Sequence, residues 1–177
     1  VTDGLPALAL ATDRIDPDVL SRLPQRPDAE LLDRSFLGQT LLAGALTASA
    51  ALAVFAYEYT GPGELEQARD AAFTTLVFAE LLRSFGARSA TRTVWEVGLL
   101  SNVRLFGIVA ASMALQIGIH HSADLRDLFG VGTVTGWQCV AWTLVGLAPL
   151  AVLESLKVAK RRYRRFSSPG PSRRVAA

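Results

Sequence analysis

A single uncharged and mostly apolar run, from Phe36 to Tyr57, constrains this chain more than any other feature of its sequence. At about 1.5 Å per residue, a helix over this run is roughly 30 Å long, which is the thickness of the hydrocarbon core of a bilayer. Half of the chain is hydrophobic and 19% is charged, whereas charge usually reaches about 25% in soluble domains. A buried all-α soluble domain can share this composition, so the positions of the charges have to decide between the two classes.

Three more apolar segments follow, and the sequence predicts membrane spans at 36–57, 66–85, 102–119 and 134–156. The second is the least regular, because its purely apolar part is short for a span and its extension carries Glu80 near one end. The last contains Pro149, which predicts a kink of the kind that neighbouring helices make tolerable.

The arginine residues fall mostly on one side of this predicted layout. The connections before the first span and between the second and third, together with the C-terminal tail, hold most of them, whereas the opposite side holds only Arg69 and Arg126. Cytoplasmic segments of membrane proteins are rich in Lys and Arg, and a soluble bundle has no reason to sort its arginines in this way. We therefore predict an all-α, multi-pass helical bundle in the cell membrane, with the C-terminus in the cytoplasm.

An acidic side chain stands at the head of an apolar stretch in the motif Thr-Asp-Gly-Leu-Pro, residues 2–6. An ionisable group in membrane-type sequence is costly, which makes Asp3 a candidate functional residue. The neighbouring Gly4 and Pro6 indicate an unwound segment whose freed carbonyls, with the side chain of Thr2, can reach an ion within the membrane. The residues alone fit equally well with Asp3 as the cap of a short surface helix.

Glu80 is the second acidic candidate, and two interpretations of it stay open. It can bind an ion, or it can pair with Arg83, which follows one helical turn later. Glu154 and Lys157 have the same spacing, and we expect them to pair near the cytoplasmic end of the last span.

The remaining metal-binding residue types give weaker signals. The single Cys139 has no partner for an internal disulfide, and we predict that it is a small buried hydrophobic residue. His120 and His121 are adjacent and so do not share a helix face, which favours an interfacial loop over a metal site.

The motif at residues 2–7 resembles the sixth transmembrane helix of P-type cation-transporting ATPases of the calcium-pump type. Residues 73–85 resemble the eighth helix of that family, residues 99–102 resemble the start of the ninth, and the likeness extends through about residue 165. The resemblance implies the second half of helix six over residues 1–12 and a cytoplasmic loop over 13–34. It further implies a four-helix transmembrane domain, helices seven to ten, over 35–165, and a disordered cytoplasmic tail over 166–177.

In that family, ATP phosphorylates an aspartate in a cytoplasmic domain, and the resulting conformational cycle moves cations across the membrane. The resemblance implies that this chain supplies scaffold helices and the ion ligands Thr2, Asp3 and Glu80, with Ca²⁺ or Mn²⁺ as the transported ion. Ca²⁺ takes six to eight oxygen ligands, of which Asp3 offers two. ATP and Mg²⁺ would be bound by other domains of the same pump, so we expect no ATP hydrolysis by this chain alone. The expected partners are those domains and the lipid bilayer, with no nucleic acid.

Two further interpretations follow from the charged segments. Asp13, Asp16 and Asp18 can guide cations, stay solvated or dock on a neighbouring cytoplasmic domain, and we favour docking. The basic C-terminal tail favours anchoring at anionic lipid over a calmodulin-type partner. The alternative for the whole chain is a free-standing four-helix membrane protein with a structural or assembly role.

Overall fold

The computed structural model describes residues 4–14, 34–61 and 64–167. The described residues form helices and connections and contain no strand, which confirms the predicted all-α class. In chain order the helices are α1 (Gly4–Ala11), α2 (Arg34–Thr60), α3 (Leu65–Gly86), α4 (Val94–Val97), a 3₁₀ helix (Leu99–Ser101), α5 (Val103–His121), α6 (Ala123–Phe129) and α7 (Gly136–Ser167).

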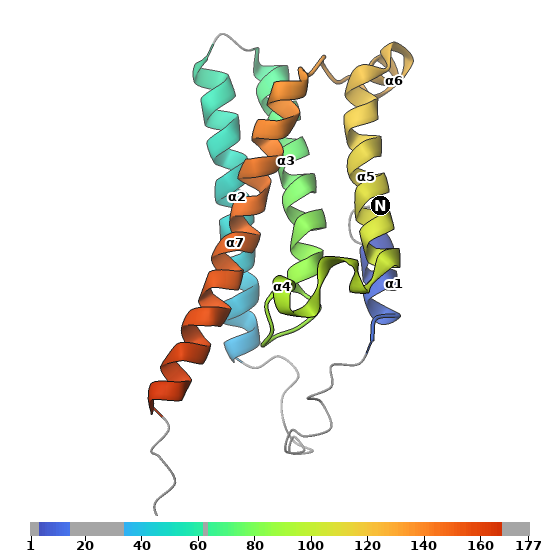
Figure 1. Ribbon diagram of the computed structural model, residues 1–177. Coiled ribbons are helices and arrows are strands. Elements are labelled where there is room, and N and C mark those ends of the chain that lie inside the picture. The colour runs from blue at the N-terminus through green and yellow to red at the C-terminus, as the bar shows by residue number, and fades with distance from the viewer. Residues whose placement is uncertain (1–3, 15–33, 62–63, 168–177) are drawn as a thin grey trace, which may run out of the picture.

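Four long helices, α2, α3, α5 and α7, stand side by side, with α3 in the middle (Figure 1). The helix α3 packs against α2 and α7 and also contacts α5, while the short α1 lies against α5 and α3. We call the end of the bundle that holds α4 and the C-terminal ends of α1 and α3 the α4 end. The opposite end, with α6, is the α6 end.

The predicted spans coincide with the four long helices to within a few residues, except that α7 continues through Ser167. Three of these helices are long and apolar enough to cross a membrane: Phe36–Thr60, Val103–His121 and Gly136–Tyr163. The fourth, α3, is 22 residues long but also carries charged residues. It lies among the other long helices, and its role as a fourth span remains a prediction.

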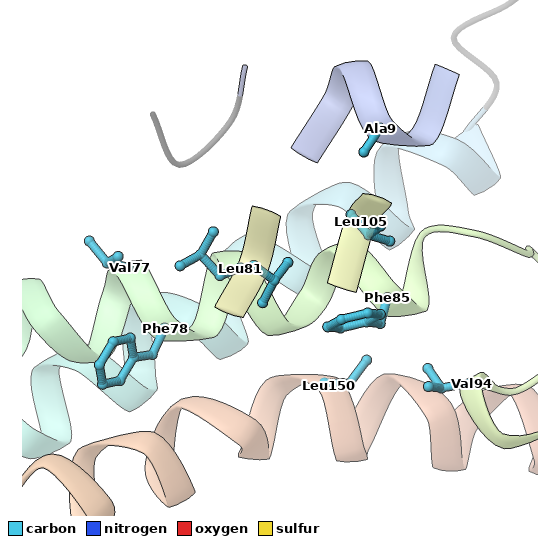
Figure 2. Close-up of a cluster of buried hydrophobic side chains, with 9 residues drawn as sticks. Ala9, Val77, Phe78, Leu81, Phe85, Val94, Leu105 and Leu150 are labelled. Carbon is cyan, nitrogen blue, oxygen red and sulfur yellow. The ribbon is translucent and has the colours of Figure 1, made fainter. Parts of the chain in front are cut away.

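The main cluster of buried side chains lies in the half of the bundle nearer the α4 end (Figure 2). It combines residues from five segments: Ala9, Val77, Phe78, Leu81, Phe85, Val94, Leu105, Val109 and Leu150. In lipid, apolar burial drives helix association less than it does in water, so close van der Waals contact has to hold such a cluster together. The cluster thereby fixes α1, α5 and α7 around α3.

The helix α7 lies close to the backbone of α3 at Gly146. A Cβ atom built there would lie 3.2 Å from the backbone nitrogen of Ala79 and 3.2 Å from the carbonyl oxygen of Thr75. Small residues let membrane helices approach in this way. Pro149 lies one turn further along, is fully buried, and does not end α7.

A second, smaller cluster lies toward the α6 end and is built from Val54, Ala71, Val134, Cys139 and Trp142. Cys139 is buried, as predicted for a small hydrophobic residue. The indole Nε1 of Trp142 donates to Glu58 Oε1 at 3.3 Å. This hydrogen bond joins the first part of α7 to the last part of α2.

Candidate functional site

Of the three predicted ion ligands, Glu80 lies among the described residues, whereas Thr2 and Asp3 lie outside them. The helix α1 begins at Gly4, directly after this pair in the sequence. The structure brings the last part of α1 against α3, because Ala9 packs in the same cluster as Val77 and Leu81, which flank Glu80 along the helix.

Within the described part of the chain, Glu80 belongs to the most exposed face of α3. The face is a stripe of partly or fully exposed residues that recur every three or four positions, and so lie in one row along the helix: Arg69, Phe73, Leu76, Glu80 and Arg83. Ten other residues of α3 are buried. The central helix α3 therefore carries the Glu80 carboxylate on the side where a further helix could pack.

A groove with a volume of about 450 Å³ runs between this stripe and α2. Its lining residues are Gly44, Thr47 and Ala48 from α2 and Leu76, Val77, Glu80 and Arg83 from α3. The hydroxyl of Thr47 is buried and has no hydrogen-bond partner within the described part of the chain. Thr47 was not among the residues singled out from the sequence, where one threonine in an apolar helix gives no signal of its own.

The carboxylate of Glu80 pairs with Arg83, as one of the two interpretations predicted. The Nε of Arg83 donates to Glu80 Oε2 at 3.1 Å, and its Nη2 donates to the same oxygen. No group of three or more potential metal-binding side chains occurs within residues 4–14, 34–61 and 64–167. A calcium site at Glu80 would therefore need most of its oxygen ligands from elsewhere.

At the α4 end, α1 is tied to the rest of the bundle by an ion pair between Asp13 and Arg88. The Nε of Arg88 donates to Asp13 Oδ2 at 2.6 Å, and this contact holds the pKa of the Asp13 carboxyl below its ordinary value. Asp13 therefore pairs within its own domain, and docking of this acidic segment on a neighbouring cytoplasmic domain stays a prediction. Asp16 and Asp18 lie outside the described residues.

A second set of charges at this end links the α3–α5 connection to α7. Arg161 and the backbone and side chain of Thr93 bind the Glu96 carboxylate and lower its pKa to about 2. Glu154 accepts from the Nζ of Lys157 at 2.7 Å, which confirms the predicted pair, and also from the backbone nitrogen of Val94 at 2.8 Å.

The two histidines do not form the interfacial loop that the sequence led us to expect. They are the last two residues of α5, and His120 is only 2% exposed. Its Nε2 lies 3.2 Å from Thr74 Oγ1, and its Nδ1 lies 3.0 Å from the carbonyl oxygen of Gly132. The prediction failed because α3 and the α6–α7 connection supply polar partners that the local sequence does not reveal.

Taken with its apolar helices, this arrangement is that of a membrane domain, and comparison with known proteins gives its class. Residues 1–159 match the family described as "Cation transporting ATPase, C-terminus", and the chain belongs to this family. The membership confirms the resemblance to P-type cation-transporting ATPases and favours a pump domain over the free-standing membrane protein.

Several individual relatives of the chain are calcium-transporting ATPases. The chain is 31% identical to calcium-transporting ATPase 1 of Bacillus cereus over 179 residues, which cover 91% of this chain and 20% of the relative. It is 33% identical to a calcium-transporting ATPase of Bacillus subtilis over 146 residues, 82% of this chain and 16% of the relative. It also matches the mouse calcium-transporting ATPase type 2C member 2, at 24% identity over 89% of this chain and 17% of the relative. The chain thus spans about one fifth of the length of such relatives.

Proposed function

We propose that this chain is the C-terminal membrane domain of an ATP-driven calcium pump and supplies part of its ion-binding site. Its family membership and the names of its relatives support the class of transporter. The observation that carries the proposal for the site is the position of Glu80, a partly buried carboxylate on the most exposed face of the central helix α3. Partly buried acidic groups in membrane helices mark ion pathways.

The proposed ligands from this chain are Asp3, Thr2 and Glu80. The acidic group of Asp3 precedes α1, which packs on α3 through Ala9, so both carboxylates belong to neighbouring segments. The remaining oxygens that Ca²⁺ needs would come from other helices of the pump, which would cover the exposed stripe of α3. In this arrangement Ca²⁺ has to compete with the Arg83 guanidinium for Glu80 Oε2.

The proposed topology places the α4 end and the C-terminus in the cytoplasm and the α6 end on the opposite side, with lipid around α2, α5 and α7. The distribution of arginines supports this orientation, since Arg88, Arg92, Arg104 and Arg161 belong to the α4 end. Residues 1–12 would be the end of helix six, 13–34 a cytoplasmic loop, 35–165 the four-helix domain, and 166–177 a cytoplasmic tail.

ATP and Mg²⁺ would bind to other domains of the same pump, so this chain is proposed to act as a scaffold and ion-binding part without hydrolysing ATP itself. The purified chain should release no phosphate from ATP above a heat-inactivated control, with or without calcium. Release above that control would contradict this part of the proposal.

The ligand assignment is tested by calcium-dependent phosphorylation of the full-length pump that contains this chain. Replacing Asp3 by Asn removes the charge from a divalent-ion site, which by analogy with a buried ion pair costs roughly 3–5 kcal/mol. We therefore expect the half-saturating calcium concentration to rise on the order of a hundredfold or more.

Glu80→Gln should have a smaller effect than Asp3→Asn, because Arg83 already engages the carboxylate. Asp127→Asn, in the short helix α6 at the other end of the bundle, serves as a matched control and should leave the calcium dependence unchanged. Repeating the titration with Mn²⁺ distinguishes the two candidate ions. An unchanged calcium dependence in Asp3→Asn would mean that Asp3 is only a helix cap.

A further inference from the structure

Arg88, just beyond the C-terminal end of α3, is the most completely engaged charged side chain at the α4 end. Its guanidinium binds both carboxylate oxygens of Asp13, through Nε at 2.6 Å and Nη2 at 3.1 Å. It also donates from Nη1 to the carbonyl oxygen of Gly98 and from Nη2 to Ser101 Oγ, each at 2.7 Å. The Arg88 side chain is 4% exposed and that of Asp13 is 13% exposed.

These contacts need the planar guanidinium group of an arginine, which carries several N–H donors. A lysine presents a single ammonium group and cannot reach two carboxylate oxygens, a carbonyl and a hydroxyl in one plane. The carbonyl of Gly98 is turned toward the guanidinium by a backbone φ of 85°, a conformation that glycine adopts far more readily than other residues. The connection after α3 is thus shaped around Arg88.

Apart from the packing of Ala9 and Leu10 in the main buried cluster, the helix α1 has few contacts that hold it in place. It has eight residues, of which Pro6 and Ala9 are buried, whereas Leu5 is 44% and Leu8 66% exposed. Its other polar anchor lies at the same end, where Asn102 Nδ2 donates to the carbonyl oxygen of Ala9 at 3.2 Å. The orientation of α1 therefore depends on contacts at its C-terminal end.

The two helices joined by the Asp13–Arg88 pair run toward the α4 end in the same direction (Figure 1). At about 1.5 Å of rise per residue, Gly4 stands about 10 Å, and Glu80 about 9 Å, before the ends of their helices. Asp13 thus lies about as far beyond Gly4 as Arg88 lies beyond Glu80. The buried pair between them places Gly4 and Glu80 at a similar level along the bundle.

We infer that Arg88 is a positioning residue that fixes the register of α1 against α3 and thereby sets the position of the start of α1, at Gly4, relative to Glu80. The inference rests on the proposed function. Arg88 does not touch the ion in this arrangement. It acts through Asp13, and loss of the pair leaves α1 free to shift relative to Glu80.

The test is Arg88→Gln in the full-length pump that contains this chain, measured as phosphorylation by ATP over a range of calcium concentrations. We expect the half-saturating calcium concentration to rise about tenfold, as for substitutions that act on a site without touching its ligand. Phosphorylation at saturating calcium should be retained, because the shifted ligands still close around the ion. Asp13→Asn should act in the same direction, and the double variant should be no worse than Arg88→Gln alone.

Glu96→Gln is the matched control, because it removes an ion pair at the same end that links α4 to α7 without involving α1. It should leave the calcium dependence unchanged. A folded Arg88→Gln pump with the calcium dependence of the wild type would overturn the inference. If Arg88→Gln fails to fold, Asp13→Asn keeps the side-chain shape, and an unchanged calcium dependence there would overturn it equally.

A second measurement separates this inference from the proposed function. Spin labels at Leu8 and at Glu66, which is exposed and lies outside the stripe, report the distance between α1 and α3 in the full-length protein. Arg88→Gln should broaden or shift this distance and Glu96→Gln should not, and an unchanged distance in Arg88→Gln would overturn the inference. If the wild type shows no calcium-dependent phosphorylation, the proposed function fails, and the distance measurement still decides whether Arg88 positions α1.

Discussion

Single residues set how closely the helices of this bundle approach one another. At Gly146 the absence of a side chain brings α7 against the backbone of α3, with Phe78 Cβ 3.3 Å from the position that a Cβ would take. At Arg88 a single side chain joins three segments through four hydrogen bonds. In a membrane, such contacts decide helix association because apolar burial contributes little to it.

Gly146→Ala should destabilise the bundle by about 1–3 kcal/mol, the usual cost of inserting a methyl group into a tightly packed site. The atoms in its way, the nitrogen of Ala79 and the carbonyl oxygen of Thr75, belong to the backbone and cannot turn aside. Thermal unfolding of the purified protein in detergent measures the effect.

Gly118→Ala in α5 is the control, because a Cβ there meets nothing within 4 Å. It should leave the melting temperature unchanged or raise it slightly, since alanine favours a helix over glycine by about 0.5–1 kcal/mol. Equal melting temperatures for the two variants would show that α3 and α7 are not in close contact.

Among the secondary-structure elements, α5 is held differently at its two ends. Its start is fixed by Asn102, which accepts a hydrogen bond from the backbone nitrogen of Leu105 and donates to α1. Its end is fixed by His120, which bridges Thr74 of α3 and the connection before α7. Between them most of the helix is exposed or half-buried, so these polar ends carry much of its attachment.

His120→Ala should lower the free energy of unfolding by about 2 kcal/mol, because it removes the two hydrogen bonds of a buried side chain, each of which contributes about 1 kcal/mol. Hydrogen exchange should also become faster in the connection 131–135, which loses its hydrogen bond to the imidazole. Both effects are measured on the purified protein.

His121→Ala is the matched control on the neighbouring residue. His121 is exposed and bonds to the carbonyl of Ile117 within its own helix, so its loss should change stability by less than about 0.5 kcal/mol. Similar losses for the two variants would contradict the burial of His120.

For the whole molecule, the separation of charge between the two ends of the bundle sets the expected orientation. The arginines at 34, 88, 92, 104 and 161 belong to the α4 end, and those at 69 and 126 lie toward the α6 end. Positive charge is retained on the cytoplasmic side during membrane insertion. The match to calcium-transporting ATPase 1 of Bacillus cereus covers 91% of this chain, including both ends of the bundle, and about one fifth of that relative.

The orientation is tested by single cysteines introduced at Ala90 and Gly61, both exposed and at opposite ends, with the natural Cys139 replaced by Ala. A membrane-impermeant maleimide should label Gly61→Cys in intact cells and Ala90→Cys only after the membrane is opened. Labelling of Ala90→Cys in intact cells would reverse the proposed topology.

The amino-acid sequence by itself determined the helices and the contacts within them. Uncharged apolar runs predicted α2, α5 and α7, because a helix of that length has to satisfy its backbone internally in lipid. Spacing alone predicted the Glu80–Arg83 and Glu154–Lys157 pairs, since residues three apart on a helix are neighbours. The candidate ligand Glu80 came instead from the resemblance of residues 73–85 to the eighth helix of the pump family.

Only the tertiary structure decided which faces of these helices meet. Asp13 and Arg88 are 75 residues apart, and His120 and Thr74 are 46 apart, so no local pattern links them. The helices α2 and α5 are largely apolar all round and give no periodic signal of their inner face. The burial of His120, the unpartnered hydroxyl of Thr47 and the open face of α3 therefore follow from packing, because in a membrane the shape of the contact surfaces selects the neighbour.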